Sequence, residues 1–300
     1  MVKWLRYNRR AQLGVVVLVA AAALVAGLAI EKRTHPCAPP RGQGDKIAFD
    51  NQQDIYVMDA DGSNLCRLTY DAADNSNPTW SPDSKELAFF SSRDRIDGIY
   101  VMQADGSNVR RVLATSHRTG LDWSADGKYL AFVSNDDPSY LSVIDVDGSN
   151  MRHVMAGASY GRVSWSPDGK SIAIVTGRDH WNQVSVVEAD GSNLRIVADE
   201  RVAGIADYQN PAWSPDGQRL ALDKKSKVCL VNAEGSNGHC LDVNPTNGNN
   251  QYPTWSPDSQ RIAFVSYGLA AQDGIYVMNA DGSNVSRLTK NGGFNLAWSP

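Results

Sequence analysis

The sequence has few cysteines and no excess of basic residues. Four cysteines among 300 residues are too few for a disulfide-stapled scaffold, and no CxxC pair indicates a zinc site. Lys plus Arg total 29 and Asp plus Glu total 33, which gives a formal net charge of -4. Because binding to a phosphate backbone needs a basic surface, this balance argues against nucleic acid as the main ligand.

Glycine and tryptophan are more informative. The hydrophobic fraction of 42% is sufficient for a packed core and excludes a wholly disordered chain. The sequence also contains 25 glycines and eight tryptophans. Turn-forming glycine together with large aromatic residues favours many short strands over long helices.

The first thirty residues are typical of a membrane-targeting segment. Residues 1–12 contain four basic residues and no acidic one, namely Lys3, Arg6, Arg9 and Arg10. Residues 13–30 carry no charge, and as a helix they would span roughly 27 Å, close to the ~30 Å hydrocarbon core. We therefore expect a cytoplasmic basic segment, a transmembrane signal anchor over residues 13–30, and a periplasmic or extracellular remainder.

The same segment is also compatible with a cleaved signal peptide or a lipoprotein signal. Residues 27–29 form a small-x-small sequence at which a signal peptide could be cleaved, and the protein would then be secreted. The uncharged run exceeds the ~7–15 residues of a usual signal-peptide core, which favours the anchor. A lipid-modified Cys37 is disfavoured, because His and Pro precede it instead of small residues. Residues 31–45 are rich in Pro, Gly and charge and are expected to form an extended tether.

Residues 46–300 contain one unit written six times. A Trp-Ser pair recurs at spacings of 43, 42, 48, 42 and 43 residues, at Trp80, Trp123, Trp165, Trp213, Trp255 and Trp298. The tetrapeptide Asp-Gly-Ser-Asn recurs from Asp61, Asp105, Asp147, Asp190 and Asp281, and a copy beginning with Glu234 fills the gap. This period matches the ~40–45 residues of a four-stranded propeller blade.

One unit predicts four strands and the chain ends predict how the ring closes. Within residues 78–115 we expect strands over 78–81, 86–90, 98–102 and 109–113. The last unit supplies only a first strand, and the first unit, which begins at Lys46, lacks one. Pairing these two ends would complete a sixth blade and remove the open sheet edge. The predicted fold is an all-β, six-bladed propeller with 1+3 strand closure.

The string PTWSPDSKELAFFSS…GIYVMQADGSNVRRV resembles the WD40-like propeller repeats of the TolB family, which also occur in the propellers of some peptidases. The resemblance covers residues 46–300 and implies the propeller fold without specifying an activity. TolB itself is a periplasmic component of an envelope complex and has an additional α/β domain. The peptidases have a separate hydrolase domain. We expect neither domain here, so the partners and activities of those proteins do not transfer.

Two motifs that suggest chemistry have a simpler structural interpretation. Residues 157–161 match GxSxG, but a nucleophile elbow needs a following helix, and here the first strand of the next blade follows. The sequences at 59–62 and 145–148 resemble fragments of a calcium loop, but Tyr70 and Ala156 stand where the closing carboxylate is required. Tight hairpins explain all six copies. We predict no metal and no cofactor, although histidines from different blades could still meet at the central channel.

The four cysteines suggest two disulfides. Cys229 and Cys240 are equidistant from the Glu234-Gly235 turn, and a two- or four-residue loop would place them directly opposite. A three-residue bulged loop would instead place Cys229 opposite His239. Cys37 and Cys66 form a second possible pair, since the compartment is expected to be oxidising.

The two faces of the ring differ in their sequence variation. The face with the first-to-second-strand turns and the Asp-Gly-Ser-Asn hairpins, here called the turn face, is nearly the same in every unit. The opposite face, here called the loop face, varies, and variable loops on a rigid scaffold commonly carry function. We expect binding residues there, where aromatic and basic side chains suit an interface: His117, Arg118, Tyr160, Arg162, Trp181, Tyr208, Tyr252 and Phe294.

These observations predict a membrane-anchored, monomeric propeller that binds a protein or peptide of the cell envelope without catalysis. Because the tether enters at the start of a second strand, we expect the turn face to face the membrane. Two alternatives are a hydrolase or lyase with a metal or catalytic site at the channel, and a module that binds carbohydrate or cell wall.

Overall fold

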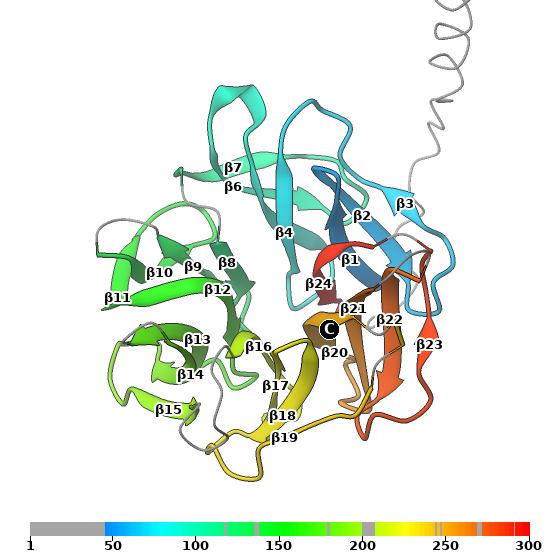
Figure 1. Cartoon of the computed structure of the whole chain (residues 1–300). Coiled ribbons are helices and arrows are strands. Elements are labelled where there is room, and N and C mark those ends of the chain that lie inside the picture. The colour runs from blue at the N-terminus through cyan, green and yellow to red at the C-terminus, as the bar shows by residue number, and fades with distance from the viewer. Residues whose placement is uncertain are drawn as a thin grey trace, which may run out of the picture. The chain divides into compact units, whose positions relative to one another are not determined.

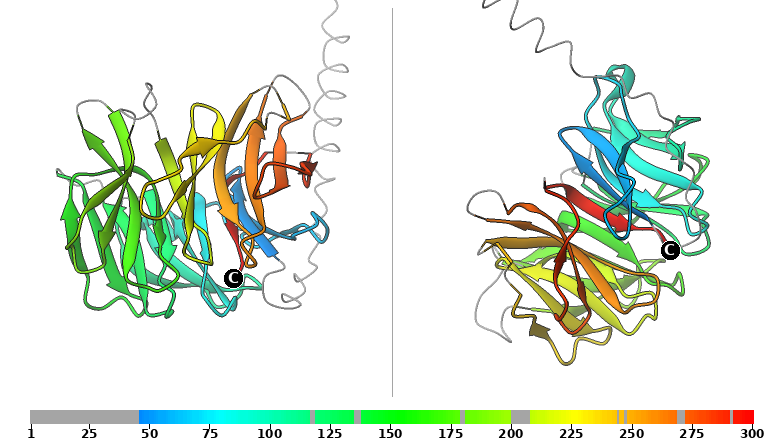
Figure 2. Two further views of the ribbon diagram at one scale, coloured as in Figure 1. Left: turned by 90° about the horizontal axis from the view of Figure 1, so that it is seen from below. Right: turned by 90° about the vertical axis from the view of Figure 1, so that its right-hand side faces the viewer.

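The structure is a computed structural model and describes residues 46–116, 119–134, 138–178, 181–199, 208–243, 245–246, 248–268, 272–290 and 292–300. The chain divides into two compact units, Met1–Pro36 and Cys37–Pro300, and every described residue belongs to the second. The described residues form six four-stranded antiparallel sheets around a central channel (Figure 1). Two further views show these sheets standing side by side as the blades of a propeller (Figure 2). The predicted six-bladed propeller is confirmed.

Blade 1 combines the last strand with the first three, and blades 2 to 6 follow in chain order. From the channel outward, blades 1 to 3 consist of β24 (Phe294–Trp298), β1 (Lys46–Asn51), β2 (Asp54–Asp59), β3 (Cys66–Arg67); β4 (Asn75–Trp80), β5 (Glu86–Ser91), β6 (Gly98–Gln103), β7 (Arg110–Ala114); and β8 (Thr119–Trp123), β9 (Tyr129–Ser134), β10 (Tyr140–Asp145), β11 (Arg152–Ala156). Blades 4 to 6 consist of β12 (Ala158–Trp165), β13 (Ser171–Arg178), β14 (Trp181–Glu188), β15 (Arg195–Ala198); β16 (Tyr208–Trp213), β17 (Arg219–Lys224), β18 (Lys227–Asn232), β19 (His239–Cys240); and β20 (Asn249–Trp255), β21 (Arg261–Tyr267), β22 (Gly274–Asn279), β23 (Ser286–Arg287). A short 3-10 helix, η1 (Arg93–Arg95), lies between β5 and β6.

The ring closes through the two ends of the propeller sequence. β24 pairs antiparallel with β1, and Trp298 lies opposite Ile47 in the register. Beyond the strands, the Ser299 amide donates to the Lys46 carbonyl at 2.9 Å, and the Lys46 amide donates to the Ser299 hydroxyl at 3.2 Å. The first blade is therefore completed by a strand from the far end of the sequence, as predicted.

The repeated tryptophans pack between neighbouring blades. Trp80, at the end of β4, lies in a buried cluster with Ile55 of blade 1 and Leu87 of its own blade. Trp255 takes the equivalent place between blades 5 and 6, and its indole N–H donates to the Ala212 carbonyl at 3.1 Å. These residues recur because each blade needs the same contact with the blade before it.

The Asp-Gly-Ser-Asn hairpins recur for a similar reason. Gly148 has a φ of +90°, and a Cβ atom there would lie 2.6 Å from the carbonyl oxygen of Val112 in the preceding blade. Only glycine combines that backbone conformation with so close an approach. The Asp147 carboxylate accepts hydrogen bonds from the Ser149 amide at 2.9 Å and the Ser149 hydroxyl at 2.6 Å. The carboxylate is thus used within the turn, which supports a hairpin rather than a calcium loop.

Cys229 and Cys240 lie directly opposite each other on β18 and β19 and form a disulfide. The next pair in the register is Leu230 with His239, so the alternative pairing of Cys229 with His239 does not occur. Cys66 is half-buried on β3. Cys37 lies outside the described residues, so its pairing with Cys66 stays a prediction.

In the part of the chain that the structure describes, no helix is long and apolar enough to span a membrane. Residues 1–45, which include the expected anchor and tether, lie outside this part. Both expectations therefore stay predictions from the sequence.

Candidate functional site

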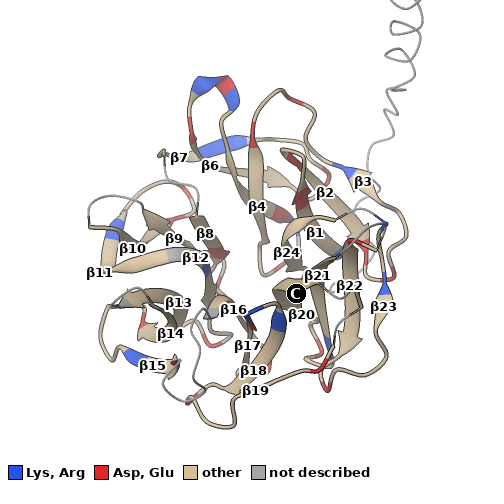
Figure 3. Cartoon of the chain, in the orientation of Figure 1, with Lys and Arg blue, Asp and Glu red and all other residues tan. Residues whose placement is uncertain are grey.

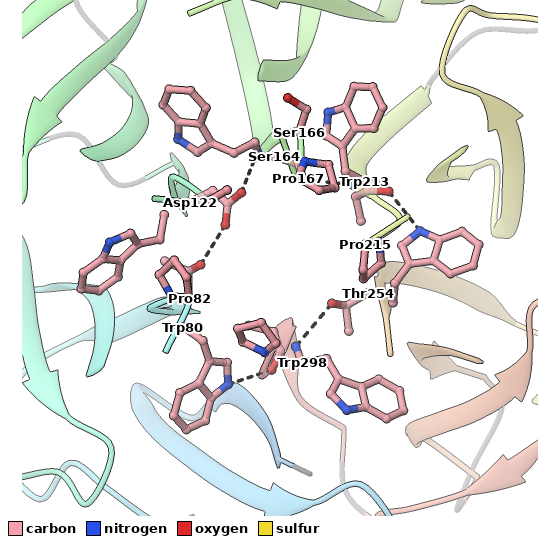
Figure 4. A pocket seen from close by; sticks show the side chains of 18 of the residues that line it. Trp80, Pro82, Asp122, Ser164, Ser166, Pro167, Trp213, Pro215, Thr254 and Trp298 are labelled. Atoms are coloured by element: carbon pink, nitrogen blue, oxygen red, sulfur yellow. Dashed lines mark hydrogen bonds between the residues drawn. The ribbon is translucent and has the colours of Figure 1, made fainter. Parts of the chain in front are cut away.

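A cavity of about 330 Å³ lies at the centre of the ring and opens on the turn face. All six blades contribute to it through the ends of their innermost strands and the turns that follow (Figure 4). Proline forms the rim in five blades, and Ala125 takes that place in blade 3. The rim prolines are Pro82, Pro167, Pro215, Pro257 and Pro300. We call this cavity the funnel.

Strand alternation explains how polar side chains come to line the funnel beside the six repeated tryptophans, which line it as well. Successive side chains of a strand point in opposite directions, so the residue before each inter-blade tryptophan faces the channel. These six residues all line the cavity: Thr79, Asp122, Ser164, Ala212, Thr254 and Ala297. The funnel floor is therefore partly polar, although each of its strands ends in a repeated aromatic residue.

Asp122 joins three blades at this level. Its Oδ2 atom accepts the backbone amide of Trp165 at 2.7 Å, and its Oδ1 atom accepts the hydroxyl of Thr79 at 2.9 Å. Burial raises the pKa of the Asp122 carboxyl, and these two hydrogen bonds act in the opposite direction. The same link to the next blade recurs, from the amide of Trp213 to Ser164 at 3.1 Å and from the amide of Trp298 to Thr254 at 3.4 Å (Figure 4).

A bulge in each innermost strand brings further residues to the channel. In blade 5 the register between β16 and β17 shifts between Gln209 and Ala212. The residue three positions before the tryptophan takes a left-handed conformation, with φ between 49° and 58°, in five blades: Asn77, Gly120, Asn210, Tyr252 and Asn295. In blade 4 Gly161 instead adopts the positive φ, of 147°, and Arg162 occupies the channel position.

Arg162 lines the funnel and reaches from blade 4 to blade 6. Its Nη1 atom donates to the carbonyl of Pro253 at 3.4 Å. A guanidinium has five N–H donors, and among the described residues this is its one hydrogen bond, with no carboxylate within ion-pair distance. Burial lowers the pKa of Arg162, and the negative charge of Asp122 acts against this. Arg162 is thus a partly buried cation, and most of its N–H donors have no acceptor in the part of the chain that the structure describes.

Asp223, on β17, is a buried carboxylate close to Arg162. Its Oδ2 atom accepts the side-chain amide of Asn210 at 2.8 Å and the backbone amide of Tyr252 at 3.3 Å. No donor among the described residues reaches its buried Oδ1 atom. Burial raises the pKa of Asp223 to about 6. The negative charge at this position is therefore held at a cost in free energy.

Asp50 has the same geometry in blade 1. One of its carboxylate oxygens accepts the side-chain amide of Asn295 at 2.9 Å and the backbone amide of Asn77 at 3.1 Å. As in blade 5, an Asn of the same blade and the bulge of the next blade supply the two donors. Burial also raises the pKa of Asp50. Three carboxylates thus lie near the single guanidinium of Arg162.

Of the eight predicted binding residues, the structure describes three side chains, those of Arg162, Tyr252 and Phe294. Arg162 lines the funnel, and Tyr252 is half-buried beside Asp223. Phe294 is 41% exposed and packs edge-on against Tyr252 with ring centroids 6.2 Å apart. Tyr160, Trp181 and Tyr208 lie at or near the starts of β12, β14 and β16 with side chains outside the described part of the chain, and His117 and Arg118 lie wholly outside it.

Asp50, Asp122 and Asp223 were not predicted. The sequence did contain a signal for two of them, because the position of Asp50 and Asp223 in the second strand is apolar in the other four units: Phe90, Val133, Val175 and Val265. A carboxylate at an otherwise apolar strand position indicates a special environment. The predicted binding residues belong to the variable loop face, whereas these two carboxylates lie on second strands.

The described residues contain no three His, Cys, Asp or Glu side chains placed to hold a metal ion. Ser159 of the GxSxG sequence lies within β12, which continues to Trp165 as an innermost strand. Acidic and basic residues are spread over all the blades (Figure 3). At the channel, by contrast, three carboxylates interact electrostatically with one guanidinium.

Comparisons with known proteins agree with this architecture. A family model described as the TolB beta propeller domain matches residues 32–202 and 135–300. Tricorn protease homolog 1 of Streptomyces coelicolor is 30% identical over 105 residues, and the match covers 33% of this chain and 10% of that protein. The crystal structure of TolB from Acinetobacter baumannii has a TM-score of 0.73 at 18% identity, over 99% of this chain and 74% of that one. A chain of a Nidogen/Laminin complex has a TM-score of 0.70 at 10% identity, over 85% and 98% of the two chains.

Proposed function

Because the chain belongs to the TolB β-propeller family, we propose that it is a non-catalytic scaffold that binds a protein or peptide partner in the funnel. The observation that carries this proposal is the funnel itself. It combines a rim of prolines with a floor on which Arg162 has unused donors and Asp122 has remaining acceptor capacity. Concave sites that pair apolar walls with a few polar groups are typical binding sites.

The proposed location is outside the cytoplasm, on a membrane anchor. Residues 13–30 have the length and hydropathy of a transmembrane segment, and basic residues precede them. The fifteen residues 31–45 would extend to at most about 50 Å. Since β1 begins at Lys46 on the turn face, a tether of this length leaves room for a partner between that face and the membrane.

This proposal places the partner on a different face from the one expected from sequence variation. The loops of the loop face vary between units, but the cavity opens on the turn face. Arg162 combines the two properties, because its position varies between units and its side chain lines the funnel. Phe294 and Tyr252 would then contribute to the loop-face end of the channel.

Affinity capture from an envelope extract tests the proposal. The immobilised propeller is compared with Arg162→Gln and with Arg111→Gln, which makes the same chemical change on the exposed outer strand β7. We expect one or more proteins to bind the wild type and Arg111→Gln and to be lost from Arg162→Gln. Thermal melts of the three proteins check that the ring is intact. Equal capture by all three would contradict binding at the funnel.

A further inference from the structure

We propose that the funnel floor recognises an uncharged amide group, carried by a short loop of the partner between Arg162 and Asp122. This inference rests on the proposed function and specifies the chemistry of the ligand. A carboxamide has a carbonyl that accepts hydrogen bonds and an N–H group that donates them. Asn, Gln and the peptide backbone all present this pair of groups.

Arg162 provides the donors for the carbonyl. Its guanidinium lines the funnel and makes a single hydrogen bond of 3.4 Å among the described residues. A partly buried guanidinium with unused donors gains free energy when an acceptor reaches it. The structure therefore favours a ligand atom with lone pairs at this place.

Asp122 provides the acceptor for the N–H group. Each of its two oxygens accepts one hydrogen bond, and a carboxylate oxygen has a second lone pair. Asp122 and Arg162 both line the funnel and are not in ion-pair contact with each other. The space between an acceptor and a donor that do not touch suits a group that has one of each.

The charge balance decides against a charged ligand. Asp50, Asp122 and Asp223 all interact electrostatically with Arg162, so a carboxylate ligand would bring a fourth acidic group to the same guanidinium. An ammonium group has no acceptor to offer to the N–H donors of Arg162. Burial raises the pKa of all three acids and lowers that of Arg162, so ionised groups are already disfavoured here. A neutral amide meets both hydrogen-bonding needs without adding charge.

The size of the funnel limits how much of the partner enters. A volume of about 330 Å³ is at the small end for ligand sites and holds one or two residues rather than a domain. A chain terminus would bring its own charge into the site. The loop tip of a partner, with an Asn or Gln side chain, fits both the volume and the charge.

Selection from a library of disulfide-constrained random heptapeptides tests this inference. We expect peptides selected on the immobilised wild-type propeller to be enriched in Asn or Gln at one position and depleted in Asp and Glu there. One selected peptide is then synthesised with Asn and with Asp at that position. The wild type is expected to bind the Asn peptide roughly tenfold more tightly or better, because the Asp peptide places like charges together.

Three variants locate the effect. Asp122→Asn keeps the shape of the side chain and removes its charge, so the preference for the Asn peptide should fall below roughly threefold. Arg162→Gln should weaken binding of both peptides. Asp242→Asn makes the same change as Asp122→Asn on a side chain that is 99% exposed, and it should leave both affinities unchanged. Melting curves of all variants confirm that they are folded.

The outcomes separate the two proposals. Selected peptides that prefer acidic or basic residues, or that ignore both Asp122→Asn and Arg162→Gln, would overturn the amide inference and leave peptide binding intact. Failure to select any peptide would overturn both proposals. Binding of the propeller to sugars on a glycan array, with no peptide selected, would also overturn both proposals and would favour a carbohydrate-binding module.

Discussion

Two neighbouring positions of each innermost strand differ in how much they vary between blades. The tryptophan is the same in all six blades and packs between blades, as Trp80 and Trp255 illustrate. The residue before it is Thr, Asp, Ser or Ala and faces the channel. The repeated position meets a need that every blade has, namely contact with the blade before it. The varied position meets a need that the ring has only once, which is a polar floor.

The second strands repeat the comparison. Four of them carry Phe or Val at one position, and two carry the buried carboxylates Asp50 and Asp223. Each carboxylate accepts hydrogen bonds from its own blade and from the next, so the exchange preserves the contact between blades by polar means. An apolar residue at this position stabilises the ring at any pH, whereas a carboxylate makes its stability depend on protonation.

Deleting residues 296–300 is expected to have the largest effect on the repeated contacts between blades. The deletion removes the completely buried Leu296 and the nearly buried Trp298, and it opens the edge of β1. We expect the free energy of unfolding to fall by roughly 5 kcal/mol or more and the melting temperature by roughly 10 °C or more. Differential scanning calorimetry measures both. An unchanged melt would contradict closure of the ring by β24.

Two glycines distinguish a position that every blade repeats from one that it does not. Gly148→Ser should cost roughly 2–4 kcal/mol, because a Cβ there meets the Val112 carbonyl of the neighbouring blade. Gly169→Ser is the matched control, since its Cβ would have no atom within 4 Å. The equivalent turns already contain Ser84 and Ser259 at a φ of 57°, so we expect a cost below about 1 kcal/mol. Chemical denaturation compares the two variants, and equal costs would mean that the hairpin glycines recur only for their turn.

The pH dependence of stability tests the varied position of the second strand. The carboxyl of Asp223 has a pKa raised by burial to about 6, against an ordinary value of 3.8. Between these values the folded protein holds a proton that the unfolded chain releases, so this group lowers stability as the pH rises. Relative to Asp223→Asn, the wild type should lose about 2 kcal/mol between pH 4 and pH 7. Urea denaturation at both pH values measures this loss, with Asp242→Asn as the exposed control. A difference between wild type and Asp223→Asn that does not change with pH would contradict a raised pKa of Asp223.

The repeats made the fold predictable. Six copies of Trp-Ser and Asp-Gly-Ser-Asn predicted the blades, and β5, β6 and β7 begin within one residue of the predicted starts. β4 begins three residues earlier than expected, because its bulge lets Asn75 and Ser76 pair with β5 before the strand reaches Trp80. Local pattern suffices for most of a propeller, since five of the six blades are formed from consecutive residues.

The site was less predictable because it depends on the ring. Arg162 and Tyr252 were selected from the sequence because they differ between units. Asp50, Asp122 and Asp223 belong to strands from three different blades, and only closure of the ring brings them around one guanidinium. Asp50 and Asp223 accept hydrogen bonds from backbone amides in the bulge of the next blade, which a single unit does not reveal.

Site-specific photo-crosslinking tests most directly whether the partner binds at the turn face. A benzoylphenylalanine replaces Ala125, which is exposed on the funnel rim, or Phe294, which is 41% exposed at the loop-face end of the channel. Both proteins are irradiated in cells that express them as full-length chains. Our account predicts one specific crosslinked adduct from position 125 that is lost when Arg162→Gln is added, and weak or no adduct from position 294. A specific adduct from position 294 and none from position 125 would contradict it.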